Sequence, residues 1–113
     1  MRTVQGLLKD HDVVWVYLEN KETGRQFIRQ ARDEGFCFTS GKVPDEDDWG
    51  YVMAIHKDKT LAHLSTTVWV MSFQMNVPSL PPRVNYAKYA AGNEDYICKT
   101  SGFSGVIVDF RQV

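Results

Sequence analysis

The feature that most constrains the fold is a run of six apolar residues, Val13-Val14-Trp15-Val16-Tyr17-Leu18. β-branched and aromatic side chains in series favour an extended strand. Successive side chains of a strand point to opposite faces, so Val14, Val16 and Leu18 share one face. The opposite face is apolar as well, which is typical of a central strand or of a strand with one face used for binding. The run therefore predicts a sheet with this segment inside it.

The second feature is an amphipathic helix, which we expect over residues 21–34. Asn20 is a good N-terminal cap, and Phe27, Ile28 and Ala31 form an apolar stripe. Gly35 is placed to end the helix in a left-handed conformation. This segment is the best candidate for a main helix packed on the sheet.

The remaining elements are shorter. Thr3 can cap a short helix that carries Val4 and Leu7, and residues 84–91 have the length of two helical turns. Three prolines within residues 78–82 exclude a central strand there. Strands are expected at residues 36–38, 51–56, 61–65, 66–73, 96–99 and 105–110, with 61–73 as one long strand or two. The fold class that follows is α+β: an antiparallel or mixed sheet of about five to six strands, one main helix on one face, and one or two short helices.

Length and charge restrict the function classes. The 113 residues suit a single domain over 1–113, and 13 basic against 14 acidic residues give a net charge of -1. Binding of bulk nucleic acid needs a basic surface, so we do not expect it. No apolar run approaches the ~20 residues of a membrane span, and the N-terminus does not read as a signal peptide. We expect a cytoplasmic protein in which Cys37 and Cys98 are reduced thiols.

Motifs for catalysis are weak. His56 and His63 lie at the two ends of a predicted hairpin, and two imidazoles at one place can bind a metal or move protons. No third ligand stands nearby in sequence, and neither cysteine has an adjacent base. The segment from Pro78 to Arg83 matches a PxxPxR ligand motif, although a rigid connecting loop is the favoured interpretation. We therefore expect no catalytic residues, no metal and no cofactor, and we keep a small histidine-dependent hydrolase as an alternative.

The acidic run Asp45-Glu46-Asp47-Asp48 does not make an EF-type calcium loop. Such a loop needs a bidentate Glu at its twelfth position, and His56 stands there when the count begins at Asp45. A solvated acidic loop is the favoured interpretation.

Aromatic residues exceed what one sheet face and one helix stripe need. The surplus comprises Trp15, Tyr17, Trp49, Tyr51, Trp69, Tyr86, Tyr89 and Tyr96. Flat rings beside Arg or Lys suit stacking on a base and pairing with a phosphate, and they suit a protein interface equally. A core filled with aromatics is the plainer reading. For a binding pocket the candidates are Trp49, Tyr51, Arg83, Tyr86 and Tyr89.

The order of motifs over residues 1–75 resembles small phage and prophage accessory proteins of Firmicutes. The resemblance lies in the strand from Val13, the helix with Phe27 and Ile28, the Gly35-Phe36 exit, the Ser40-Gly41 turn, Trp49, and a closing strand through Tyr51 to Ile55. Several families of this kind act against bacterial immunity. The resemblance implies a counter-defence role in an infected bacterial host, without giving a ligand.

Taken together, these features favour a phage-encoded protein that binds and sequesters a nucleotide-like immune signal without cleaving it. A homo-oligomer is compatible with this role, since an edge strand such as the last one can pair across a dimer. The alternative is a protein inhibitor of the anti-CRISPR type, which would bind a host nuclease through its acidic and proline-rich segments. The partner is then a small ligand or a host defence protein.

Overall fold

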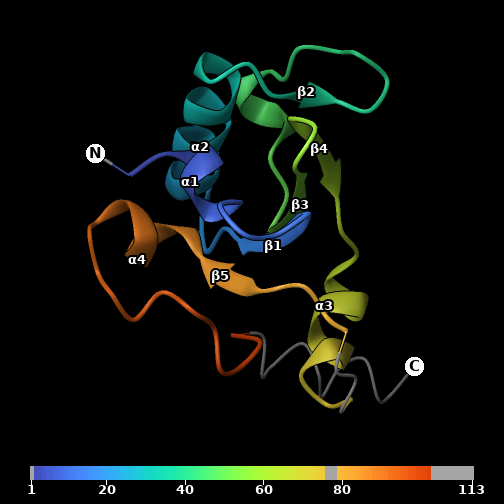
Figure 1. Ribbon diagram of the computed structural model, residues 1–113, viewed down its shortest axis with the longest axis vertical. Helices are drawn as coiled ribbons and strands as arrows, with labels where there is room; N and C mark the ends of the chain where they lie inside the picture. The colour runs from blue at the N-terminus through green and yellow to red at the C-terminus, as the bar shows by residue number, and fades with distance from the viewer. Residues whose placement is uncertain (1, 76–78, 103–113) are drawn as a thin grey trace.

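The computed structural model describes residues 2–75 and 79–102 (Figure 1). The expected strand at 105–110, the dimer edge built on it, and Pro78 lie outside the described residues. Within them the helices are α1 (Val4–Leu7), α2 (Lys21–Asp33), α3 (Thr66–Ser72) and α4 (Tyr86–Ala90), with a 3₁₀ helix η1 (Glu46–Asp48). The strands are β1 (Val13–Tyr17), β2 (Cys37–Phe38), β3 (Val52–His56), β4 (Thr60–His63) and β5 (Arg83–Asn85).

The five strands form one mixed sheet in the order β2-β4-β3-β1-β5. β1 is interior, as its sequence predicts: it pairs antiparallel with β3 and parallel with β5, so that Tyr17 lies opposite both Val52 and Asn85. β3 and β4 form an antiparallel hairpin, and β2 pairs parallel with β4. This arrangement confirms the α+β class.

The helix ends form where the sequence indicates. The side chain of Thr3 accepts a hydrogen bond from the backbone N–H of Gly6, and that of Asn20 accepts from the N–H of Thr23. Each bond satisfies a donor that a helix leaves unpaired in its first turn. After α2 the chain leaves through Gly35 at φ +91°, a conformation that favours glycine.

The expectation of β structure over residues 66–73 is wrong. The strand ends at His63, and Ser65 caps α3 by accepting from the N–H groups of Thr67 and Val68. The local preference for a strand is overridden here by packing. In a strand, Trp69 and Val70 would point to opposite faces, whereas in the helix both side chains pack against the sheet and are buried. The question of one strand or two over residues 61–73 therefore resolves as a strand followed by a helix.

The two later segments also differ in detail from the prediction. Within residues 84–91, Val84 belongs to β5, and the helix α4 begins only at Tyr86. Residues 96–99 make a single antiparallel bridge, between Ile97 and Val84, instead of a full strand.

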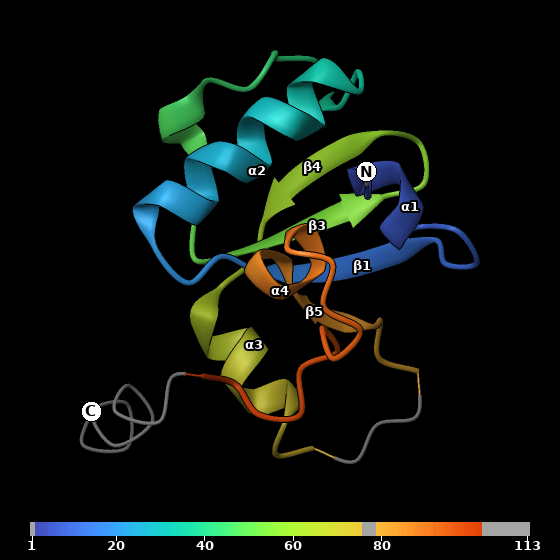
Figure 2. The same ribbon diagram turned by 90° about the vertical axis from the view of Figure 1, so that its left-hand side faces the viewer.

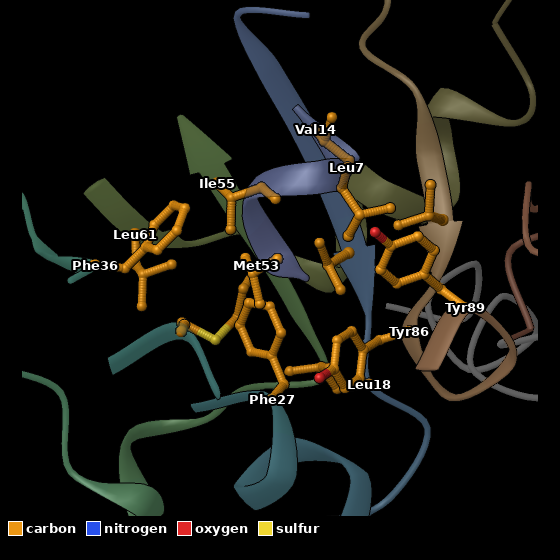
Figure 3. Close-up of a cluster of buried hydrophobic side chains, with 14 of the residues drawn as sticks. Leu7, Val14, Leu18, Phe27, Phe36, Met53, Ile55, Leu61, Tyr86 and Tyr89 are labelled. Carbon is orange, nitrogen blue, oxygen red and sulfur yellow. The ribbon is translucent and has the colours of Figure 1, made fainter. Parts of the chain in front are cut away.

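Helices cover both faces of the sheet, with α2 above and α3 below the strands in Figure 2. The main core lies between the sheet and α1, α2 and α4, and Figure 3 shows its side chains converging. Its largest fully buried members include Phe27, Phe36, Leu18, Met53 and Tyr86. A smaller cluster on the opposite face joins Trp69 and Val70 of α3 to Val52. Among the described residues, no helix has both the length and the apolar character that a membrane crossing requires.

Candidate functional site

The candidate site is a hollow of about 210 Å³ beside the ends of β1 and β5, called the β1–β5 hollow below. Tyr17 is the last residue of β1 and Asn85 is the last of β5, and both line it. The two strands run parallel, so their carboxyl ends lie together. Ligands of open sheets with parallel strands bind at such carboxyl ends. Lys88 of α4 and the segment that follows α4 supply the remaining wall.

Polar and charged side chains dominate this wall. Among the residues that line it, Lys88, Lys99 and Asp95 are exposed, and they bring two positive charges and one negative charge to the hollow. The side-chain oxygen of Asn85 accepts a hydrogen bond from the backbone N–H of Lys88. This bond orients the amide, whose NH₂ group is the remaining donor.

Tyr17 forms the inner part of the wall. Its ring stacks on Trp69, with centroids 6.0 Å apart and planes inclined by 19°. Burial and, to a lesser degree, the charge of Glu19 raise the pKa of Tyr17. Gly102 lies against the same ring at φ +77°, and a Cβ there would stand 3.3 Å from the Tyr17 hydroxyl oxygen. Glycine is required at this position by both the backbone conformation and the close approach.

Cys98 also lines the hollow, with a free and half-buried thiol. Burial raises its pKa to about 11, although the positive charges of Lys88 and Arg83 act in the opposite direction. The thiolate is the reactive form of cysteine, so this thiol is a poor nucleophile near neutral pH.

Tyr96 is fixed from the side opposite the hollow. Its ring meets Tyr89 edge to face at 5.1 Å, and the guanidinium of Arg2 lies 5.3 Å from its centroid. The Arg2 guanidinium also donates to the Asn93 carbonyl oxygen at 2.8 Å and forms an ion pair with Glu94. The segment that walls the hollow is thereby held to the N-terminal residues.

The residues predicted from sequence to form a pocket do not come together in one place. Trp49 and Tyr51 are neighbours, edge to face with centroids 5.1 Å apart. The indole of Trp49 packs on Gly24 of α2, while Tyr51 is 49% exposed. Neither residue lines the β1–β5 hollow, although Tyr51 is close enough to raise the pKa of Tyr17 slightly.

Tyr86 and Tyr89 lie in the main core, 1% and 6% exposed. The Tyr86 hydroxyl donates to the side-chain oxygen of Gln30, and the Tyr89 hydroxyl donates to the Thr3 carbonyl oxygen at 2.6 Å. Both rings therefore contribute to the core, as the plainer reading of the aromatic surplus expects.

Arg83 occupies a third location, where it joins β5 to α3. Its guanidinium lies 4.0 Å from the centroid of Phe73 and donates to the carbonyl oxygen and the hydroxyl oxygen of Ser72. Its charge still reaches the hollow, since it acts on the Cys98 thiol.

The two histidines of the hydrolase alternative are not cross-strand neighbours. His56 lies opposite Val13 on β1, whereas His63 lies opposite Met53 on β3. The His63 ring stacks on Phe38, with centroids 5.7 Å apart. In the part of the chain that the structure describes, no group of three or more His, Cys, Asp or Glu side chains is placed to hold a metal ion.

The acidic run lies at the surface, with Asp45 and Asp47 exposed, and it forms a short 3₁₀ helix with cationic neighbours instead of a loop. Glu46 forms ion pairs with Arg25 at 4.0 Å and with Arg29 at 3.3 Å. Lys42 pairs with Asp48 at 3.1 Å, and the pKa of that carboxyl is lowered by bonds from the Asp45 N–H and from Lys42. These pairs neutralise much of the acidic face on which the nuclease-inhibitor alternative depends.

Sequence reasoning missed the hollow because its walls come from segments far apart in the chain. Tyr17 and Tyr96 belong to the aromatic surplus, but nothing local marks Asn85, Lys99 or Thr100 as their neighbours. The parallel pairing of β1 with β5 is the missing signal. Comparisons with models of protein families, with curated protein sequences and with solved structures found no match.

Proposed function

We propose that the protein binds a small nucleotide-like ligand in the β1–β5 hollow and holds it without cleaving it. The observation that carries the proposal is the pair of lysines at the carboxyl ends of two parallel strands, beside hydrogen-bonding groups from Asn85 and Thr100. Ammonium groups bind phosphate as point charges, and the amide and hydroxyl can recognise the sugar or base.

Binding without cleavage is supported by the state of the Cys98 thiol. With a pKa of about 11, this thiol is protonated at neutral pH and does not attack a phosphoryl or glycosidic centre. In a phage accessory protein, such binding would remove an immune signal from an infected host cell. The host and the cytoplasmic location rest on the resemblance of residues 1–75 described above.

Isothermal titration with cyclic dinucleotides, cyclic ADP-ribose isomers and nucleoside monophosphates tests the proposal. At least one of them should bind with a dissociation constant of about 10 μM or tighter, which corresponds to roughly 7 kcal/mol. Mass spectrometry of the released ligand should recover it unchanged. The proposal is abandoned if none of these compounds binds, or if the bound compound is recovered as a cleaved product.

A matched pair of variants locates the binding. The double substitution Lys88→Gln and Lys99→Gln should weaken binding by roughly tenfold or more, because the phosphate loses two charge-assisted contacts, each weakened by its exposure to solvent. Lys57→Gln is the control, since Lys57 is exposed in the β3–β4 turn and pairs only loosely with Asp12, at 3.9 Å. Equal affinity for all three proteins would place the ligand elsewhere.

An inhibitor of a host nuclease is the second candidate function. A groove of about 180 Å³ between α3 and the sheet is lined mainly by apolar side chains, among them Trp15, Val68 and Met71. Val68 is 45% and Met71 42% exposed, which is typical of a surface that contacts a protein. Met71→Glu should abolish inhibition of purified nuclease cleavage while leaving small-ligand binding intact. Retained inhibition would exclude the groove as the contact.

A further inference from the structure

We infer that the β1–β5 hollow recognises the sugar and phosphate of its ligand and leaves the base outside. This inference rests on the proposed function and specifies which part of a nucleotide enters the site. It makes the protein tolerant of different bases, in contrast to the base-stacking pocket expected from the aromatic surplus.

The aromatic rings around the hollow are already engaged by the protein. Tyr17 stacks on Trp69, and Gly102 covers the hydroxyl end of its ring. The ring of Tyr96 contacts Tyr89 edge to face, and the guanidinium of Arg2 lies over it. The protein thus occupies part of each ring, which leaves a base less aromatic surface on which to stack.

The volume of the hollow also indicates that the base of a nucleotide stays outside it. Its volume of 210 Å³ is small for a ligand site. Pockets for drug-sized ligands measure roughly 300–1,000 Å³. A volume of this size favours a sugar ring with its phosphate over a complete nucleotide as the part of the ligand that enters the hollow.

The wall carries suitable partners for a sugar phosphate. Lys88 and Lys99 provide positive charge for the phosphate, and the carboxylate of Asp95 accepts hydrogen bonds from sugar hydroxyls. The Asp95 backbone N–H donates to the Asn93 side chain, which holds this turn in shape. The residues that line the hollow therefore carry two positive charges against one negative charge. This balance suits an anion with hydroxyl groups.

Ligand fragments test the inference directly. AMP, GMP, CMP and UMP should bind within about threefold of one another, and ribose 5-phosphate within about tenfold of AMP. Adenosine should bind at least tenfold more weakly than AMP, because it lacks the group that the lysines contact. The inference is overturned by any of three results: adenosine binds as tightly as AMP, ribose 5-phosphate binds more than tenfold more weakly than AMP, or the affinities of the four monophosphates differ by more than about threefold. If no phosphate compound binds, the proposed function itself fails.

Asp95→Asn distinguishes sugar recognition from simple attraction of an anion. Replacing the carboxylate by a neutral amide should weaken the binding of ribose 5-phosphate by roughly fivefold, since the sugar hydroxyl exchanges a charged acceptor for a weaker neutral one. The same substitution should strengthen the binding of inorganic phosphate slightly, because it removes one negative charge from the hollow. Lys99→Gln should weaken the binding of both compounds, and Lys57→Gln should leave both affinities unchanged. If Asp95→Asn strengthens the binding of both compounds equally, the hollow recognises the phosphate alone and the sugar does not contribute to binding.

Discussion

Gly24 is the position at which two opposing physical effects can be separated most clearly. It lies in α2, where alanine is favoured over glycine by about 1 kcal/mol. A Cβ at this position would stand 2.4 Å from Cδ2 and 2.5 Å from Cε3 of the Trp49 indole. These are ring atoms of a packed side chain, so the indole has to shift, and overpacking of this kind costs about 1–3 kcal/mol. The clash outweighs the propensity, and Gly24→Ala should lower the free energy of unfolding by about 1 kcal/mol.

Urea unfolding, followed by far-UV circular dichroism, measures this change. The second arm of the experiment is the same substitution in a Trp49→Ala background, where the ring and its Cγ, which would stand 2.6 Å from the new Cβ, are absent. There Gly24→Ala should raise the free energy of unfolding by about 0.5–1 kcal/mol, because only the helix propensity remains. The coupling between the two sites is then about 1.5–2 kcal/mol, within the range for residues in contact.

The reasoning is refuted by either of two results. A stabilising effect of Gly24→Ala in the wild-type background would mean that the indole moves at little cost. An identical effect in both backgrounds would mean that Trp49 does not limit this position. The first result would also reopen Trp49 as a mobile side chain available to a ligand.

Three further predictions concern single groups. Ser65→Ala should lower the free energy of unfolding by about 1 kcal/mol in urea titrations, because α3 loses the side chain that caps it; an unchanged midpoint would contradict this role. Burial raises the pKa of Tyr86 from 10.0 to about 12, so the unfolded chain loses this proton first. The free energy of unfolding should therefore fall by about 2 kcal/mol between pH 10 and 12, and Tyr86→Phe should reduce that fall in pH-dependent unfolding. Iodoacetamide should modify Cys98 at least ~100-fold more slowly at pH 8 in the folded protein than in urea, since its pKa is raised by about two units; peptide mapping that shows equal rates would refute this.

Local features of the sequence were sufficient to predict the first half of the fold. β1 and α2 follow from periodicity and from caps at Asn20 and Gly35, which act within a few residues. α3 was missed because its β-branched and aromatic residues favour a strand in isolation. Only the apolar surface of the sheet, formed by distant residues, makes the helix the better way to bury Trp69.

The candidate site was predictable only in its chemistry. A surplus of aromatic rings near basic residues is visible in sequence, but the sequence does not tell a core tyrosine from a pocket tyrosine. Tyr86 and Tyr89 are buried, whereas Tyr17 and Tyr96 line the hollow, and the difference arises from the pairing of β1 with β5. Such pairing is specified by tertiary contacts between segments on either side of the proline-rich break.

The hydrogen bonds and the ion pair that Arg2 forms with residues 89–94 affect the order in which the protein folds. The bonds of Arg2 to Tyr89, Asn93 and Glu94 span 87, 91 and 92 residues, nearly the whole described chain. Contacts of such long range carry a large loop-closure entropy and form late, after local helices and the β3–β4 hairpin. We therefore expect the wall of the β1–β5 hollow to be completed late in folding. A ligand that binds there would act chiefly on the opening of this final contact, slowing local unfolding of residues 89–102 before it changes the stability of the rest.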